Sequence, residues 1–198
     1  MKAYYDRRAP EYDEWYYGVG RFVDDDRPGW AAELAALARA LEQLPPAHTL
    51  DVACGTAFLT RRLRGDLVCL DQSPDMLAVA RARLPGATFV EGDALERLPF
   101  PDGAFDRIFT GHFYGHLGPD DRARFLAEAR RVARELVVVD SAMRVGVEPE
   151  GYQERTLNDG SRWEVYKRYF RPAELLAELG DDGAVLLDGR WFVAVRTE

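Results

Sequence analysis

Acidic side chains follow two short apolar segments of the chain at a regular interval. Asp71 lies 20 residues beyond Asp51, and Asp93 lies a further 22 residues along. Gly55 supplies a turn residue ahead of Asp71. In dinucleotide-binding folds, an acidic residue about 20 residues past a glycine turn binds ribose hydroxyls. The spacing therefore predicts a nucleoside site built around Asp71 and Asp93.

The turn around Gly55 indicates what this nucleoside lacks. A bound pyrophosphate requires glycines in the pattern G-x-G-x-x-G, and these places hold Ala53, Gly55 and Phe58. The phosphate-binding pattern G-x-x-x-x-G-K-[ST] is also absent from the sequence. We therefore expect a nucleoside without phosphates. The alternative is that Asp71 and Asp93 are helix caps or solvated turn residues.

Apolar runs of strand length alternate with helical patterns over most of the chain. Near-continuous apolar strands between helices are typical of a parallel sheet covered on both faces, so the predicted fold class is α/β. Ligands of such sheets bind beyond the carboxyl ends of the strands, where Asp71 and Asp93 stand. Ser73 and Pro74 are expected to cap and open a helix. The expected strands are residues 48–53, 67–70, 87–90, 105–110 and 135–139, and the expected helices are residues 30–44, 57–63, 73–84, 120–132 and 172–179.

The last quarter of the chain departs from this alternation. Residues 153–157 and 161–169 flank an Asn-Asp-Gly turn, which predicts an inserted hairpin. Two short final strands are separated only by Asp188 and Gly189, too short a link for a crossover, so the last strand must run antiparallel. We predict a Rossmann-like, doubly wound, seven-stranded mixed sheet with an antiparallel last strand, in a single domain over residues 1–198.

Four segments form a series of motifs at successive strand ends. The first is LDVACGTAFLT, with Asp51, Ala53, Gly55 and Ala57 at alternate places, and it is followed by LDQSPDMLAVAR, FVEGDALERLPFPDGAFDRIF and TGHFYGHL. The series resembles the motifs of the class I S-adenosylmethionine-dependent methyltransferases, whose first motif is D-x-G-x-G-x-G. The resemblance covers about residues 48–141 and implies the same seven-stranded sheet.

This resemblance implies S-adenosyl-L-methionine as cofactor and S-adenosyl-L-homocysteine as product. It implies that Asp71 binds the ribose, that Asp93 contacts the adenine amine and that the turn from Asp51 to Thr56 holds the methionine end. The opening YYDRRAPEYDEWY is similar to a segment of small-molecule and quinone methyltransferases that lays a tyrosine, here Tyr12, over the cofactor. The implied cofactor-binding residues are Tyr12, Asp51, Ala53, Cys54, Gly55, Thr56, Asp71, Gln72, Met76, Asp93, Ala94 and Thr110.

Three residues of the first motif carry further expectations. Ala53 and Ala57 stand where the family has glycines, and we expect negative φ angles there because alanine is poorly tolerated at positive φ. Cys54 is expected to be a packed turn residue and not a nucleophile, because no partner base is visible near it in the sequence.

His112 is the candidate general base, because it aligns with a pocket-lining place of the fourth segment and imidazole titrates near neutral pH. The alternative is a pocket histidine without catalytic duty, and His116 is expected to cap or pack at the following helix. Residues 1–28 are expected to form a lid and residues 142–171 an acceptor cap, with core packing as the alternative for their aromatic side chains. The expected acceptor pocket includes Tyr16, His112, Trp163 and Tyr166.

Composition excludes several classes of partner. The 26 Lys and Arg against 34 Asp and Glu give a net charge of -8, which disfavours nucleic acid. No apolar run approaches the ~18 residues of a membrane span, so no membrane partner is expected. Cys54 and Cys69 have neither metal-ligand nor disulfide spacing, so we expect a cytoplasmic protein. No metal site is expected, because the strand-end carboxylates are assigned to the nucleoside. The expected state is a monomer or a homodimer.

These observations together predict a methyltransferase that acts on O, N or C of a small-molecule acceptor. A nicotinamide-dependent reductase is one alternative, which Phe58 disfavours. A non-catalytic nucleoside-binding module is another. A methyltransferase acting on tRNA or protein is an alternative within the class, disfavoured by the acidic balance.

Overall fold

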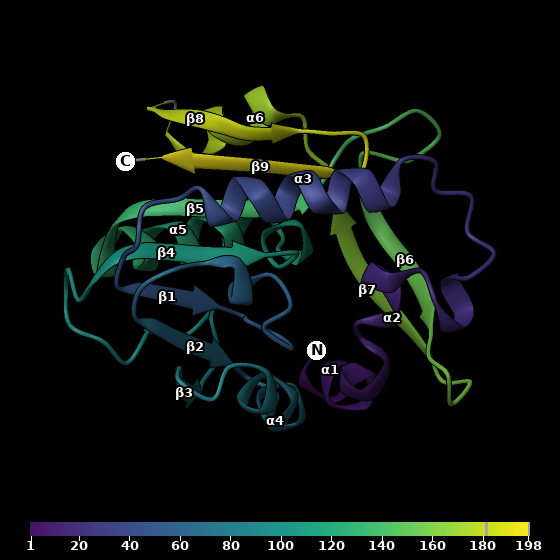
Figure 1. The fold of residues 1–198 in the computed structure, drawn as a ribbon, viewed down its shortest axis with the longest axis horizontal. Coiled ribbons are helices and arrows are strands. Elements are labelled where there is room, and N and C mark those ends of the chain that lie inside the picture. The colour runs from purple at the N-terminus through teal and green to yellow at the C-terminus, as the bar shows by residue number, and fades with distance from the viewer. Residues whose placement is uncertain (181, 198) are drawn as a thin grey trace.

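A seven-stranded sheet forms the centre of the computed structural model, which describes residues 1–180 and 182–197 (Figure 1). The strand order is β3-β2-β1-β4-β5-β9-β8. Strands β1 to β5 are parallel, and β9 runs antiparallel to both β5 and β8. The predicted mixed sheet with an antiparallel last strand is confirmed. Its strands are β1 (Thr49–Val52), β2 (Leu67–Asp71), β3 (Thr88–Glu91), β4 (Phe105–Gly111), β5 (Ala133–Ser141), β8 (Gly183–Asp188) and β9 (Phe192–Thr197).

Side chains alternate between the two covered faces of this sheet. Ile108 of β4 and Val138 of β5 belong to one buried cluster, whereas their neighbours Phe109 and Val137 belong to the other. Helix α5 packs on the first face and α3 on the second, as seen behind and in front of the strands in Figure 1. Both faces are largely apolar because helices cover the sheet on two sides. The helices are α1 (Lys2–Arg8), α2 (Glu14–Tyr17), α3 (Trp30–Glu42), α4 (Pro74–Arg83), α5 (Pro119–Val132) and α6 (Pro172–Leu179), with short 3-10 turns η1 (Ala9–Glu11), η2 (Gly20–Phe22), η3 (Thr60–Arg62) and η4 (Tyr114–His116).

The expected cap of α4 is present. The Met76 backbone N–H donates to Ser73 Oγ at 3.1 Å, and Pro74 opens the helix. This cap supplies one of the amide partners that a helix N-terminus lacks. Helix α4 therefore begins directly after the end of β2, which fixes the position of Asp71 at the sheet edge.

Two expectations about the first motif are wrong. Ala53 and Ala57 have φ angles of 58° and 55°, in the left-handed region, and do not keep negative φ. A helix over residues 57–63 is also absent, because positive φ at Ala57 cannot start a right-handed helix. The η3 turn is all that remains of that helix. The Ala57 backbone N–H donates to the Cys54 carbonyl at 2.9 Å and closes the tight turn instead.

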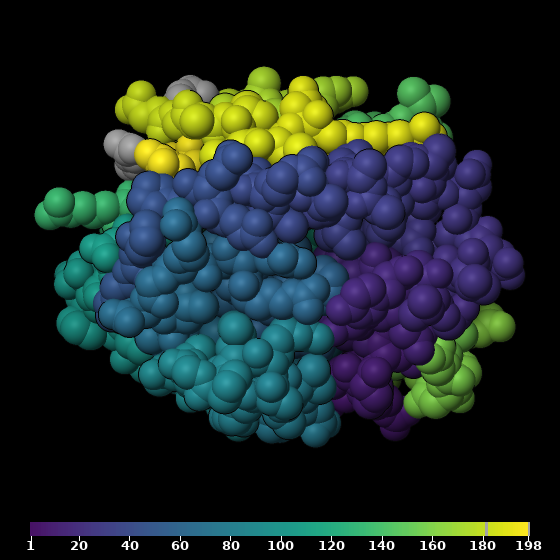
Figure 2. Space-filling model, viewed as in Figure 1, coloured from purple at the N-terminus to yellow at the C-terminus, as the bar shows by residue number. Residues whose placement is uncertain are grey.

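The N-terminal segment and the inserted hairpin lie together beyond the carboxyl ends of the parallel strands (Figure 1). Strands β6 (Glu150–Thr156) and β7 (Arg162–Arg168) form a separate antiparallel sheet, as the Asn-Asp-Gly turn predicts. Tyr4 of α1 packs against Leu157 and Val165 of this hairpin in a small buried cluster. Figure 2 shows the N-terminal segment in contact with the body of the molecule and the hairpin beside it.

Candidate active site

Two adjoining cavities open beyond the carboxyl ends of β1, β2, β4 and β5. One has a volume of about 250 Å³ and is lined by the ends of β2 and β3 and the turn around Gly55. The other has a volume of about 550 Å³ and is lined by the N-terminal segment, the hairpin and residues after β5. Both are lined by Tyr5, Tyr12, His112 and His116. These four side chains therefore form the boundary that the two cavities share, which is called the junction below.

Asp71 stands at the edge of the smaller cavity. Its Oδ2 accepts a hydrogen bond from the Gly55 backbone N–H at 2.8 Å, and its Oδ1 accepts one from the Ser73 N–H at 2.9 Å. The side chain is buried, and that burial raises the pKa of the carboxyl against the opposing effect of the backbone N–H groups. Each carboxylate oxygen keeps a second lone pair, so the group can still accept hydrogen bonds from a diol.

Asp93 lines the same cavity, as do Gln72 and Ala94. Its Oδ1 accepts a hydrogen bond from the Leu95 backbone N–H at 2.9 Å. That bond orients the carboxylate while leaving the other oxygen free to accept from a ligand amine. The cavity thus has one carboxylate at each of two neighbouring strand ends, as the sequence spacing predicts.

Tyr12 covers the turn of the first motif. A Cβ added to Gly55 would lie 3.8 Å from the Tyr12 ring, and Gly55 itself has a φ of 55°. Ala53 also lines this cavity. These groups fit a nucleoside with an amino-acid tail. The tyrosine offers a ring surface, Asp71 offers hydrogen-bond acceptors, and the turn offers backbone that a ligand can approach closely.

Four predicted cofactor residues line neither the smaller nor the larger cavity. Asp51 and Cys54 line a separate narrow cleft, and Met76 and Thr110 are packed in the interior. Asp51 is buried within β1, where one carboxylate oxygen accepts from the Thr60 hydroxyl, and burial raises the pKa of its carboxyl well above the usual range. Cys54 lines the same narrow cleft, and a hydrogen bond with Cys69 raises the pKa of its thiol well above the usual value. Met76 and Thr110 are fully buried, and the Thr110 hydroxyl donates to the Val52 carbonyl at 2.8 Å.

Thr56 connects the motif turn to the N-terminal segment. Its hydroxyl donates to Asp13 Oδ1 at 2.6 Å, and Arg83 of α4 donates to the Thr56 carbonyl at 2.5 Å. Arg83 also forms an ion pair with Asp13, 70 residues away in the sequence. Thr56 therefore ties the expected lid to the expected cofactor turn and does not line the smaller cavity.

His112 lies at the junction in a left-handed conformation with a φ of 57°. Its ring is buried against Trp15, with the two ring centres 4.9 Å apart. Burial, together with the charges of Lys167 and Arg8, lowers the pKa of its imidazole to about 4, against the opposing charge of Asp140. The ring is therefore neutral at pH 7, and its Nε2 is a buried nitrogen without a hydrogen-bond partner among the described residues.

His116 is a junction residue that the sequence interpretation placed elsewhere. It does not cap the following helix but lies in η4 and lines both cavities. Its Nδ1 lies 2.7 Å from the Tyr166 carbonyl oxygen of β7. Burial lowers the pKa of its imidazole to about 3, and the nearby charge of Lys167 acts in the same direction. The sequence feature that could have predicted this position is the strand-end motif TGHFYGHL, which contains both His112 and His116.

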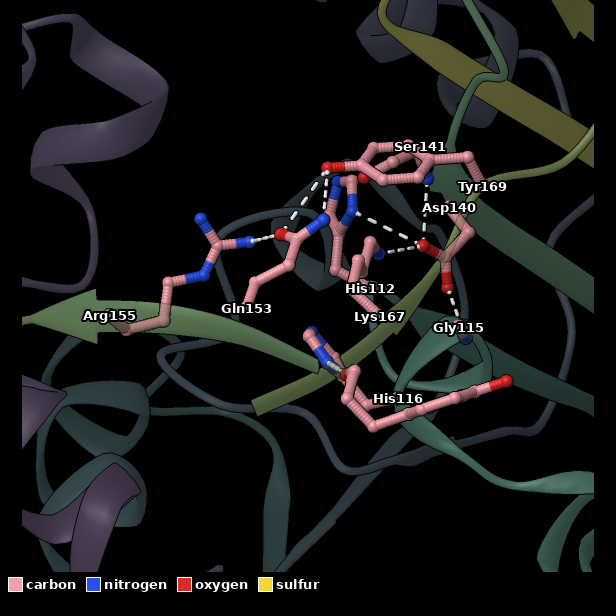
Figure 3. A network of polar contacts seen from close by, with 10 residues as sticks. His112, Gly115, His116, Asp140, Ser141, Gln153, Arg155, Lys167 and Tyr169 are labelled. Carbon is pink, nitrogen blue, oxygen red and sulfur yellow. Dashed lines mark hydrogen bonds and ion pairs between the residues drawn. The ribbon is translucent and has the colours of Figure 1, made fainter. Parts of the chain in front are cut away.

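A buried ion pair lies behind the two histidines (Figure 3). Asp140, at the end of β5, pairs with Lys167 of β7 and accepts from the Gly115 backbone N–H at 2.7 Å. Burial raises the pKa of the Asp140 carboxyl, but the Lys167 charge and hydrogen bond, together with the charge that the two imidazoles gain at low pH, outweigh it and hold that pKa below the usual range. His112 Nδ1 lies 3.9 Å from Asp140 Oδ1. The pair links the hairpin to the central sheet directly beneath the junction.

The three other predicted acceptor residues do not line the larger cavity. Tyr16 stacks on Phe58 at a ring separation of 3.8 Å. Trp163 packs against Tyr4, and the Tyr166 hydroxyl donates to Glu150 at 2.7 Å. The lining includes Trp15 and Lys167, which the sequence marks as a lid aromatic and a hairpin cation. It also includes side chains that sequence reasoning did not single out, among them Arg8, Arg144, Arg155 and Tyr169.

Metal and membrane features can be stated for the described part of the chain. Residues 1–180 and 182–197 hold no group of three or more His, Cys, Asp and Glu side chains that could bind a metal ion. None of the helices described for those residues has the length and apolar character needed to cross a membrane.

The sheet order and the carboxylate-framed cavity define a class I methyltransferase fold. Residues 50–137 match the family model described as a methyltransferase domain. These findings place the chain in the class I S-adenosylmethionine-dependent methyltransferases, a family whose cofactor is the one the motifs imply. The family expected from the sequence motifs is thereby confirmed.

Individual relatives agree with this family. A demethylmenaquinone methyltransferase of Chlorobaculum tepidum is 33% identical over 139 residues, covering 68% of this chain and 55% of that protein. A phthiotriol/phenolphthiotriol dimycocerosates methyltransferase of Mycobacterium tuberculosis is 41% identical over 97 residues, covering 44% of this chain and 34% of that protein. The chain thus spans about half or less of the length of these curated relatives.

A solved structure covers nearly the whole chain. The structure described as the DhpI-SAM-HEP complex superposes with a TM-score of 0.74 and 26% sequence identity. The match covers 98% of this chain and 94% of the other. The similarity therefore includes the N-terminal segment and the hairpin, which the 50–137 domain match leaves out.

Proposed function

We propose that this protein transfers the methyl group of S-adenosylmethionine to a small-molecule acceptor. One observation carries the proposal: the carboxylate-framed cavity and the larger cavity meet at Tyr5, Tyr12, His112 and His116. A methyl transfer needs a donor and an acceptor site that share one opening, because the two reacting atoms must come into line. The family membership and the DhpI complex with SAM support the assignment of the donor.

The smaller cavity is the proposed cofactor site. Asp71 would accept hydrogen bonds from the ribose hydroxyls and Asp93 from the adenine amine, while Gln72 and Ala94 line the same space. Tyr12 and the turn around Gly55 would hold the methionine end. Asp51, Cys54, Thr56, Met76 and Thr110 would act from behind this surface by fixing the turn and strand ends.

S-adenosylmethionine, when bound, supplies a methyl group on a positively charged sulfur. The acceptor donates an electron pair to the methyl carbon, the S–C bond breaks, and its electron pair remains on sulfur as a neutral thioether. A proton carried by the nucleophile must then leave. The protein's contribution is to align the two molecules and to exclude water, which Tyr5 and Tyr12 assist by covering the junction.

His112 is the proposed partner for that proton. Its imidazole is neutral at pH 7, and its Nε2 has no other hydrogen-bond partner among the described residues. A pKa of about 4 makes a weak base, so the ring is suited to accept a hydrogen bond from a hydroxyl whose acidity rises during the transfer. The neutral ring adds no positive charge of its own beside the sulfonium.

The acceptor is proposed to enter through the larger cavity, under residues 1–28 and 142–171. The named relatives act on demethylmenaquinone and on phthiotriol or phenolphthiotriol dimycocerosates, and the DhpI complex holds HEP beside SAM. These molecules support a small-molecule acceptor over a nucleic acid or protein. The net charge of -8 points the same way for nucleic acid.

Calorimetric titration tests the proposal directly. Purified protein is titrated with S-adenosylmethionine, S-adenosylhomocysteine and NAD, and we expect micromolar affinity for the first two and none for NAD. The variant Asp71→Asn should weaken S-adenosylhomocysteine binding about 30-fold, a loss of about 2 kcal/mol from removing a charged hydrogen-bond partner. The matched control is Asp75→Asn in the first turn of α4, which does not line either cavity. Binding of NAD alone, or equal affinities in both variants, would contradict the proposed site.

A further inference from the structure

Three half-buried guanidinium groups of the larger cavity have no acidic partner among the described residues. Arg8 of α1, Arg144 after β5 and Arg155 of β6 all line this cavity. Among residues 1–180 and 182–197, no carboxylate lies within 4.0 Å of any of them. Many of the other arginines form such ion pairs, including Arg83, Arg107, Arg122 and Arg131.

The contacts of the three groups are with neutral side chains. Arg8 donates to the Tyr4 hydroxyl, and Arg155 Nη2 donates to Gln153 Oε1 at 2.6 Å. Arg144 lies over the rings of Tyr169 and Trp191, at 5.2 and 4.9 Å from their centres. Such contacts orient a guanidinium without neutralising its charge. Figure 3 shows Arg155 joined to the Gln153 and Tyr169 network beside the buried Asp140 pair.

The acidic residues of the cavity do not balance these charges. Glu11 accepts a hydrogen bond from the Asn158 backbone N–H at 2.7 Å, and Glu154 lies 3.6 Å from Arg162 outside the cavity. Asp25 lies 3.8 Å from Arg27, and Asp26 is exposed. Lys167 is the cation that is already neutralised, because Asp140 is its partner. Arg21 also lines the cavity without an acidic partner among the described residues, but its side chain is exposed. The half-buried excess of positive charge therefore belongs to Arg8, Arg144 and Arg155.

Half-buried cations without counterions carry a desolvation cost that a bound anion would offset. A guanidinium presents a planar fork of N–H donors, which matches the paired oxygens of a carboxylate or a phosphate group. Arg8 also lies over the Tyr12 ring, 5.1 Å from its centre, and Tyr12 lines both cavities. The unpaired charge of Arg8 is thus held close to the junction.

We infer that the methyl acceptor is a small anion bearing a carboxylate or phosphate-type group, held by Arg8, Arg144 and Arg155. This inference rests on the proposed methyl transfer and names its substrate class. The aromatic rings of Trp15, Tyr169 and Trp191 line the same cavity and would contact the remainder of the molecule. A neutral quinol-like acceptor would leave the three guanidinium groups without a counterion.

A matched set of ligands tests the charge requirement. Protein saturated with S-adenosylhomocysteine is titrated with benzoate, phenyl phosphate and benzamide, since benzoate and benzamide differ chiefly in charge. We expect benzoate or phenyl phosphate to bind at least tenfold more tightly than benzamide, and the difference to shrink between 50 and 500 mM NaCl. The preferred anion of the two distinguishes a carboxylate site from a phosphate site.

Charge-removing variants locate the anion. Arg144→Gln and Arg155→Gln should each reduce the affinity for the preferred anion at least fivefold and retain S-adenosylhomocysteine binding, which reports an intact fold. The matched control is Arg162→Gln on the same hairpin, whose side chain is 72% exposed and does not line the cavity. Equal affinities for benzoate, phenyl phosphate and benzamide, or anion binding unchanged in both variants, would overturn the inference while leaving the proposed function intact. If the wild-type protein does not bind S-adenosylhomocysteine at all, the proposed function itself is overturned.

Discussion

His116 Nδ1 lies 2.7 Å from the backbone carbonyl oxygen of Tyr166, which joins the end of the fourth-strand motif to the inserted hairpin. A carbonyl oxygen only accepts hydrogen bonds, so Nδ1 must carry the proton. In a neutral ring the lone pair is then on Nε2. Because His116 lines both cavities, this tautomer supplies a hydrogen-bond acceptor at the junction.

Nitrogen-15 NMR of histidine-labelled protein checks this tautomer. We expect His116 to show a protonated Nδ1 and an unprotonated Nε2 from pH 8 down to pH 5, because burial lowers the pKa of its imidazole to about 3. The variant His116→Asn identifies its signals by their loss. A neutral ring protonated at Nε2 and not at Nδ1 would be incompatible with the hydrogen bond to Tyr166. A ring that becomes doubly protonated above pH 5 would instead contradict the lowering of its pKa by burial.

His112 should make the stability of the protein depend on pH. Its folded-state pKa of about 4 is below the ordinary value of 6.5, so the unfolded chain binds a proton over this interval and the folded chain does not. The stabilising contribution is complete above pH 6.5 and is lost as the pH falls toward 4. One proton changes the free energy of unfolding by about 1.4 kcal/mol per pH unit.

Urea unfolding of the wild type and of His112→Asn between pH 8 and pH 4 measures this effect. Asparagine is chosen because it tolerates the positive φ of this position. The variant's free energy of unfolding should decline less steeply below pH 6.5 than that of the wild type. Parallel curves for the two proteins would show that the imidazole is not held neutral by burial.

Much of this architecture was predictable because it rests on local signals. Ser73 and Pro74 cap α4, the Asn-Asp-Gly turn forms the hairpin, and the short link at Asp188 produces the antiparallel strand pair. Each depends on residues that are neighbours in the sequence. The positions of Asp71 and Asp93 follow as well, because parallel strands end at one edge of the sheet.

The larger cavity was not predictable in the same way. Arg8, Arg155 and Lys167 face it only because the N-terminal segment and the hairpin pack together, far apart in sequence. Trp163 and Tyr166, chosen from the same hairpin, point elsewhere, since the twist of a two-stranded ribbon decides which side chains face inward. The turn at Ala57 was mispredicted because alanine normally favours a helix.

The ion pair between Asp13 and Arg83 should couple the N-terminal segment to the body. Their side chains are 19% and 18% exposed, and Thr56 is hydrogen-bonded to both, so the pair is less screened than a surface pair. A double-mutant cycle with Asp13→Asn and Arg83→Gln should give a coupling energy of about 1 kcal/mol or more in urea unfolding. Arg83→Gln should also weaken S-adenosylhomocysteine binding, because the turn beside Gly55 loses the hydrogen bonds from Arg83 to Thr56.

The more exposed pair of Arg62 and Glu42 is a matched control for this cycle. Its atoms are 2.8 Å apart, yet the side chains are 38% and 46% exposed. The same substitutions there, Arg62→Gln and Glu42→Gln, should give a coupling energy of no more than about 0.5 kcal/mol. Equal coupling in the two pairs would mean that Thr56 and burial add nothing to the Asp13 contact.

Ala53 and Ala57 are held in a conformation that favours glycine, with φ angles of 58° and 55°. An L-residue in the left-handed region destabilises the folded state by roughly 1–2 kcal/mol, and glycine avoids this strain. Glycine also gives the unfolded chain more conformational freedom, which lowers the free energy of unfolding by about 0.5–1 kcal/mol. Ala53→Gly and Ala57→Gly should therefore each raise the free energy of unfolding by about 0.5 kcal/mol or more. The same substitution at exposed Ala78 in α4 should lower it by about 1 kcal/mol, since φ is helical there. If all three variants were destabilised alike, the first-motif turn would not be strained, and the alanines would fit it as well as the glycines of the family pattern.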